Sequence, residues 1–316
     1  MDTKISFPRI GIYTQPMKQM IERLGGEVIL PPPITQKTIK LGVKYSSDFM
    51  CFPFKVTLGN LIETLDTIKE HNTKLVQLGV GCSNLDIGSC RFQHYFEIQK
   101  RILADLGYDA DMILIERKNI FKFMKRINPK NNYLKVAKVF WQEYKKIREM
   151  EKKYYVFDWE DKKKVRIGIV GEWYTCIAEE INYNMFNKLK KLNVNVHQAP
   201  CATLGGYLKH QVGIESMPKK YIREGEKYYH GFLQAHSGYS LWNMFYYKDM
   251  GFDGVIHLMP LSCMPESTVE MLMDLVSKNM DLPVYHFPID EEVFQTGTDM
   301  RIKSIIRILE RSKCTT

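Results

Sequence analysis

Short apolar runs alternate with longer amphipathic runs along most of this chain, and this alternation restricts its fold more than any other feature. The first example begins with RIGIY at Arg9, continues through an amphipathic stretch at 15–24, and turns at Gly25 and Gly26 into a second apolar run. This order is typical of a strand, a helix and a second strand. Strands separated by helices pair in parallel and are covered by those helices. We therefore predict an α/β fold with parallel sheets.

The same alternation is found in both halves of the chain, on either side of a charged segment. In the first half, strands are predicted at 74–80 and 110–116, and helices after Cys51 and from Cys90. In the second half, strands and helices alternate from Val165 to the end. A chain of 316 residues also favours two domains, at about 150 residues per domain. We predict an amino-terminal α/β lobe at 1–116, a basic helical linker at 117–164 and a carboxy-terminal α/β lobe at 165–316.

The segment 117–166 holds all of the excess positive charge. It contains 17 basic and 6 acidic residues, net +11, whereas the rest of the chain contains 28 basic and 30 acidic residues, net −2. The segment has a helical period, so a solvated helix face is the simplest interpretation. A docking surface for a protein partner is a second interpretation. Nucleic-acid binding is the weakest, because the aromatic residues that alternate with its lysines can face a core instead.

Composition and the first residues predict a globular protein of the cytoplasm that does not bind a membrane. Apolar residues make up 45% of the chain and charged residues 26%, which is enough to bury a core. No apolar run approaches the ~18 residues that would span a bilayer, and the first residues lack the order of a secretory signal. Because cytosolic thiols are kept reduced, the seven cysteines are expected to pack, to bind metal or to act as nucleophiles.

Four cysteines follow predicted strands or begin predicted helices, whereas the other three are expected to be ordinary packing or tail residues. Ligands of open parallel sheets bind at the carboxyl ends of the strands, so four thiols at such places indicate a shared ligand set. Thiolates at helix starts suit an iron–sulfur cluster, and a structural zinc site made from the same four is a competing interpretation. The four candidate metal ligands are Cys51, Cys82, Cys90 and Cys263, and the three ordinary cysteines are Cys176, Cys201 and Cys314.

The sequence around these cysteines resembles the family of 2-hydroxyacyl-CoA dehydratase and benzoyl-CoA reductase components. It is most similar to the short members related to CoA-protein activases, which are themselves similar to double-cubane cluster proteins. The resemblance covers both halves of the chain in order. It rests on CFPFKVTLGNLIE, GSCRFQHYFEIQKRILADLGYD, RIGIVGEWY, GFDGVIHLMPLSCMPE and PVYHFPIDEE with Arg301.

The resemblance implies an oxygen-sensitive protein with two Rossmann-like lobes and an iron–sulfur cluster, 4Fe–4S or double-cubane 8Fe–9S, in the cleft between them. Cys51, Cys90 and Cys263 match family cysteines, whereas Cys82 matches only approximately, since SNLDIGS separates it from Cys90. Relatives receive low-potential electrons from an ATP-hydrolysing activase. The sequence contains neither GxxxxGK[ST] nor GxGxxG, so hydrolysis would belong to that partner.

Three further residues, Lys55, Arg91 and His236, are weaker candidates for roles at the site. Lys55 and Arg91 each lie near a proposed ligand in the sequence and would stabilise an anionic cluster, although both could be ordinary surface cations. In QAHSGYSLWN, only His236 and Asn243 keep the family pattern. His236 could donate to a substrate or to a cluster sulfide, but a core histidine is the simpler interpretation. His257 is expected to be structural.

The favoured function is therefore an iron–sulfur enzyme that reduces or dehydrates a small or CoA-bound substrate. The alternative is a non-catalytic cluster carrier or electron-relay subunit of a larger dehydratase complex. In that alternative a second copy or a different subunit completes the site, so a homo-oligomer or a heterodimer is expected. Three protein ligands on a cubane leave one iron open to substrate, whereas four favour electron transfer alone.

Overall fold

The structure is a computed structural model that describes residues 4–68, 75–79, 90–108, 111–114, 120–211, 217–229, 233, 237–292 and 297–315. The chain divides into two compact units, Met1–Arg148 (unit 1) and Glu149–Thr316 (unit 2). Each unit contains one four-stranded sheet whose strand pairs are all parallel. The predicted α/β class with parallel sheets is confirmed.

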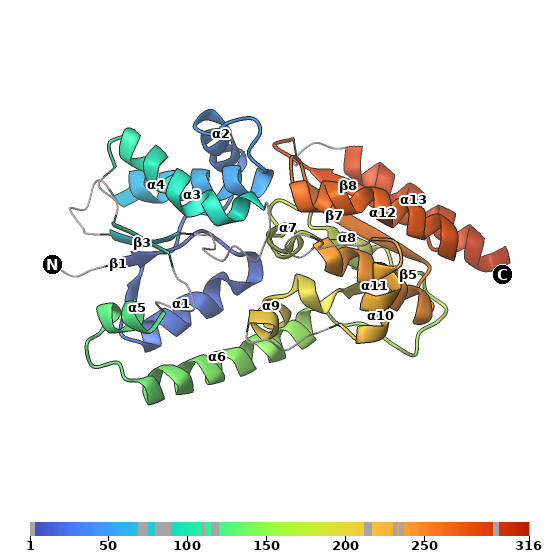
Figure 1. Ribbon diagram of the computed structural model, residues 1–316, viewed down its shortest axis with the longest axis horizontal. Helices are drawn as coiled ribbons and strands as arrows, with labels where there is room; N and C mark the ends of the chain where they lie inside the picture. Colours follow the sequence, from blue (N-terminus) through green and yellow to red (C-terminus); the bar gives the residue numbers. More distant parts are fainter. Residues whose placement is uncertain are drawn as a thin grey trace. The chain divides into compact units, whose positions relative to one another are not determined.

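Unit 1 is built on a sheet with the strand order β2-β1-β3-β4, of which Figure 1 labels β1 and β3. Its strands are β1 (Lys4–Ser6), β2 (Glu27–Val28), β3 (Leu75–Gly79) and β4 (Asp111–Leu114). Its helices are α1 (Thr14–Arg23), α2 (Gln36–Lys44), α3 (Phe52–Ile68), α4 (Tyr95–Asp105), α5 (Ile120–Ile127) and α6 (Tyr133–Tyr154), with short 3-10 helices η1 (Gly11–Tyr13) and η4 (Arg91–His94). Helix α6 continues past Arg148 into unit 2.

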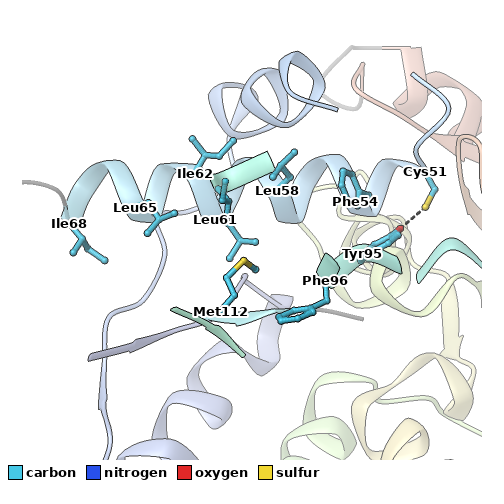
Figure 2. Packing of buried hydrophobic residues seen from close by; sticks show 11 residues of the cluster. Cys51, Phe54, Leu58, Leu61, Ile62, Leu65, Ile68, Tyr95, Phe96 and Met112 are labelled. Carbon is cyan, nitrogen blue, oxygen red and sulfur yellow. Dashed lines mark hydrogen bonds between the residues drawn. The ribbon is translucent and has the colours of Figure 1, made fainter. Parts of the chain in front are cut away.

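Two apolar clusters hold the helices of unit 1 to the two faces of its sheet. On one face, α3 and α4 pack with Met112 of β4, as Figure 2 shows. On the other face, Ile5 of β1 packs with apolar residues of α1, α5 and α6. Neighbouring residues of a strand point to opposite faces, so Met112 joins the first cluster and Ile113 the second.

The basic segment expected to be a linker contains the helices α5 and α6. Phe123 and Met124 of α5, with Val136 and Val139 of α6, belong to the core of unit 1. The division between the units therefore falls within α6, at Arg148, and differs from the expected boundaries at residues 116 and 164. The reason is physical: the lysines lie on the outer face of an amphipathic helix whose inner face completes a core.

Helices α2 and α3 approach so closely that two glycines are required at their contact. A Cβ atom on Gly42 of α2 would lie 1.7 Å from the carbonyl oxygen of Lys55. A Cβ atom on Gly59 of α3 would lie 1.9 Å from the carbonyl oxygen of Thr38. This contact fixes the amino-terminal end of α3, which directly follows Cys51.

Unit 2 is built on a sheet with the strand order β6-β5-β7-β8. Its strands are β5 (Arg166–Gly171), β6 (Asn195–Gln198), β7 (Gly254–Pro260) and β8 (Val284–Ile289). Its helices are α7 (Trp173–Ile177), α8 (Met185–Lys191), α9 (Leu204–Gln211), α10 (Lys219–Glu226), α11 (Ser237–Asp249), α12 (Met264–Met280) and α13 (Gly297–Thr315), with the 3-10 helix η5 (Pro200–Ala202). All seven residues of β7 are buried.

The two sheets are wound in the same order. In each, the first strand of the unit pairs with the second strand on one side and with the third on the other, and the fourth strand lies beyond the third. The carboxyl ends of the first and third strands flank the point at which the strand order reverses. Open α/β sheets bind ligands at this point. In unit 2 this point lies between β5 and β7.

Within the described residues, no helix has both the length and the apolar character needed to cross a membrane.

Candidate functional site

Cys51 and Cys90 lie at the starts of two helical segments in unit 1. Cys51 directly precedes α3, and Cys90 is the N-cap of η4, which leads into α4. The Cys51 Sγ atom contacts the Tyr95 hydroxyl, and Tyr95 is the first residue of α4 (Figure 2). The structure therefore brings Cys51 to the beginning of α4, five residues after Cys90. Cys51 is buried and Cys90 is partly exposed.

The two candidate cations of unit 1 accompany these cysteines along the chain. Lys55 lies in the first turn of α3 and is only 4% exposed, which is rare for a lysine. Arg91 is the first residue of η4 and is partly exposed. The alternative that Lys55 is an ordinary surface cation is wrong, because the residue is buried.

Cys263 occupies the corresponding place in unit 2. It lies three residues after the end of β7 and is the N-cap of α12, a helix of 17 residues, and its side chain is buried. The first backbone N–H groups of such a helix carry a partial positive charge. A thiolate, or an anionic group bound by that thiolate, is stabilised at this position.

An acidic residue follows β5, which flanks the expected ligand-binding point of unit 2 on the side opposite to β7. Glu172 caps α7, and its carboxylate accepts hydrogen bonds from the backbone N–H groups of Tyr174 (2.9 Å) and Thr175 (2.8 Å). Burial raises the pKa of Glu172, while these hydrogen bonds act in the opposite direction. Gly171 has φ +137°, and a Cβ atom there would lie 2.0 Å from the carbonyl oxygen of Leu258. The chain at this edge therefore requires glycine.

A second buried carboxylate, Glu266, lies in the first turn of α12 and bonds to a neighbouring strand. Its Oε2 atom is 2.7 Å from Nε2 of His257 in β7 and accepts a hydrogen bond of 3.1 Å from the Ser240 hydroxyl of α11. The other ring nitrogen of His257 is 2.8 Å from Nδ1 of His286 in β8. The remaining nitrogen of His286 is 3.1 Å from the Asp274 carboxylate.

Two further thiols lie among these acidic groups. Cys176 is in α7 and Cys201 is in η5, the segments that follow β5 and β6. Burial raises the pKa of Cys176, and burial raises the pKa of Cys201 to about 12. Glu266 raises both pKa values further, and the Asn243 amide donates to the Cys201 sulfur at 3.4 Å. Both thiols are therefore neutral at physiological pH, unlike thiolate metal ligands.

The structure places the predicted cysteines in different parts of the molecule. Cys51 and Cys90 belong to unit 1 and Cys263 to unit 2, while Cys82 and His236 lie outside the described residues. Among the residues that are described, no three His, Cys, Asp or Glu side chains are grouped so as to hold a metal ion. The shared ligand set therefore stays a prediction.

Sequence reasoning missed Glu172, Glu266 and His286, and it treated His257 as structural. Glu172 and Glu266 could have been found from the sequence, since each follows a predicted strand, in the short motifs GE and MPE. His286 could not, because its role depends on the pairing of His257 in β7 with His286 in β8.

No family model matches the sequence, and neither does any curated protein.

Proposed function

We propose that this protein is an iron–sulfur redox protein that accepts single low-potential electrons and uses them to reduce or dehydrate a small or CoA-bound substrate. In this proposal Cys51, Cys90 and Cys263 bind the cluster, with Cys82 as a fourth candidate. The electron donor is a separate activase, as the resemblance implies, and ATP hydrolysis belongs to that partner because the chain contains neither GxxxxGK[ST] nor GxGxxG.

One observation supports the proposal above the others. Each of the three described candidate ligands directly precedes or caps a helical segment, where N–H groups favour thiolate over thiol. The donor set therefore fits a group that requires ionised sulfur. When bound, such a cluster supplies single electrons.

The ligand roles are tested by iron and sulfide analysis of protein purified without oxygen. We expect Cys51→Ser, Cys90→Ser and Cys263→Ser each to lose most of the iron and the visible absorption of the cluster. Cys176→Ser is the matched control for a buried thiol, and Cys314→Ser for an exposed one; both should retain the iron of the native protein. Equal iron in ligand and control variants would overturn the proposal, and stoichiometric zinc in place of iron would favour the structural zinc site.

A reductant-dependent assay with CoA thioesters separates the enzyme from the electron relay. Turnover that is lost in the ligand variants supports the enzyme. A coordinatively saturated 4Fe–4S cluster without turnover supports the carrier or relay subunit.

A further inference from the structure

A line of hydrogen-bonding side chains runs through unit 2 from the surface to a buried carboxylate. The exposed fraction of the side chain falls along it, from 55% for Asp274 to 15% for His286, 0% for His257 and 2% for Glu266. Consecutive heavy atoms are 3.1, 2.8 and 2.7 Å apart. All three contacts are within hydrogen-bonding distance.

Counting protons shows that this line is built to take up one more. A neutral histidine carries one N–H, so two neutral rings supply two protons for three contacts between two carboxylates. The two inner contacts are satisfied when His257 donates from Nε2 to Glu266 and His286 donates from Nδ1 to His257. Nε2 of His286 is then a bare acceptor that faces the Asp274 carboxylate. One added proton at this nitrogen completes the third contact.

We propose that His286 and His257 form a proton pathway that carries a proton from the surface at Asp274 to the buried carboxylate of Glu266. A proton from water binds Nε2 of His286, and the Nδ1 proton of that ring moves to Nδ1 of His257. The Nε2 proton of His257 then moves to Oε2 of Glu266. One proton enters and one carboxylate becomes a carboxylic acid, so the charge balances, and both rings exchange tautomers.

Charged and titratable side chains from several elements lie around the pathway. Glu266 lies close enough to buried Glu172 of α7 to raise the pKa of that carboxyl, and two buried carboxylates resist being ionised together. Burial lowers the pKa of His286, and His257 lowers it further, while Asp274 and Glu270 of α12 act in the opposite direction. On the side of α13, the Arg301 guanidinium donates to the backbone carbonyl of His286, at 2.7 Å.

The destination of the proton is the carboxyl edge of the sheet of unit 2. Glu266 lies in the first turn of the helix that Cys263 caps, beyond the end of β7. The pathway itself needs no metal, so it holds or fails independently of the proposed cluster.

The pathway is tested by nitrogen NMR of protein labelled with ¹⁵N in its histidine rings, in the absence of iron. As the pH is lowered, we expect the proton of His257 to move from Nε2 to Nδ1 and that of His286 from Nδ1 to Nε2, with one shared midpoint. An infrared band of a protonated carboxyl should appear with the same midpoint. Formation of an imidazolium at His286 with His257 unchanged would overturn the proposal, and so would two rings that keep their tautomers throughout.

Substitutions extend the test. In Glu266→Gln the tautomer exchange and the carboxyl band should both disappear. Asp274→Asn removes the charge at the entrance, so the midpoint should move to lower pH, by about two- to fivefold in proton affinity. Asp249→Asn is its control, because Asp249 is in the same unit and is equally exposed, at 54%. Equal midpoints in Asp274→Asn and Asp249→Asn would contradict the assignment of Asp274 as the entrance of the pathway.

Discussion

At the scale of single residues, His197 in β6 is a histidine whose surroundings are mostly aromatic. Its ring meets the rings of Phe157, Trp159 and Phe252 edge to face, and its Nδ1 atom is 3.1 Å from the Tyr247 hydroxyl. Burial lowers the pKa of His197 to about 4, and the nearby Arg166 guanidinium adds to this effect. The native protein therefore holds His197 in its neutral form.

The lowered pKa of His197 predicts that acid destabilises the native protein. Because the pKa of His197 falls from 6.5 to about 4 on folding, the unfolded chain binds more protons between these values. The unfolding free energy should fall as the pH drops through this window, by up to about 3 kcal/mol. Chemical denaturation of His197→Gln at several pH values should show a shallower dependence. His94→Gln is the control, since His94 is exposed, and equal slopes for His197→Gln and the native protein would refute the assignment.

The candidate site shows what single residues reveal in a sequence and what they do not. The placement of Cys51 and Cys263 at helix starts could be predicted, because a turn residue between an apolar run and an amphipathic run is a local signal. The relay of Glu266, His257 and His286 could not be predicted. It depends on strand register and on the first turn of α12, which are tertiary features.

At the scale of elements, the contact between α2 and α3 leaves no room for a Cβ atom at either of two glycines. Each helix contributes one glycine, and each glycine faces a backbone carbonyl of the other helix. A backbone atom cannot rotate away as a side chain can, so an added methyl group must separate the helices. The contact therefore sets where α3 begins and where Cys51 lies.

Gly59→Ala should destabilise unit 1 strongly. Overpacking typically costs about 1–3 kcal/mol, and a carbonyl oxygen 1.9 Å from the new Cβ atom indicates a cost at or above the upper end. Gly297→Ala is the matched control, because nothing lies within 4 Å of its Cβ position, and it should be neutral or slightly stabilising. Urea denaturation followed by circular dichroism measures both variants. A Gly59→Ala variant as stable as Gly297→Ala would show that the helices separate at little cost.

The longest helix shows how composition misleads at this scale. Its net positive charge favoured a solvated linker, but the buried positions Val136, Val139, Glu143 and Ile147 recur every three or four residues. The spacing of these buried positions can be recognised in the sequence, whereas the surface that the helix covers cannot. An amphipathic helix can be recognised locally, but its partner cannot.

At the scale of the whole molecule, two separate cores predict two unfolding steps. The chain has four tryptophans, of which Trp141 belongs to unit 1 and the other three to unit 2. Tryptophan fluorescence should therefore follow mainly unit 2, and circular dichroism both units. We expect the two probes to give different urea midpoints. Gly59→Ala should shift the circular dichroism curve more than the fluorescence curve, and coincident curves for both proteins would instead indicate one cooperative unit.

The alternation of strands and helices was sufficient to predict two parallel sheets, but it did not specify their strand order. In both units the chain leaves the first strand toward one side and returns to pair on the other. No local pattern specifies that reversal, because it depends on which face of the sheet each crossover helix covers and on the handedness of the crossovers.

That common winding gives each unit one sheet edge of the kind at which α/β folds bind ligands. The side chains that follow the strands differ between the two edges. In unit 2 they include the carboxylates of Glu172 and Glu266, whereas in unit 1 the Cys51 sulfur contacts the Tyr95 hydroxyl. Two sheets of the same topology therefore present different chemistry.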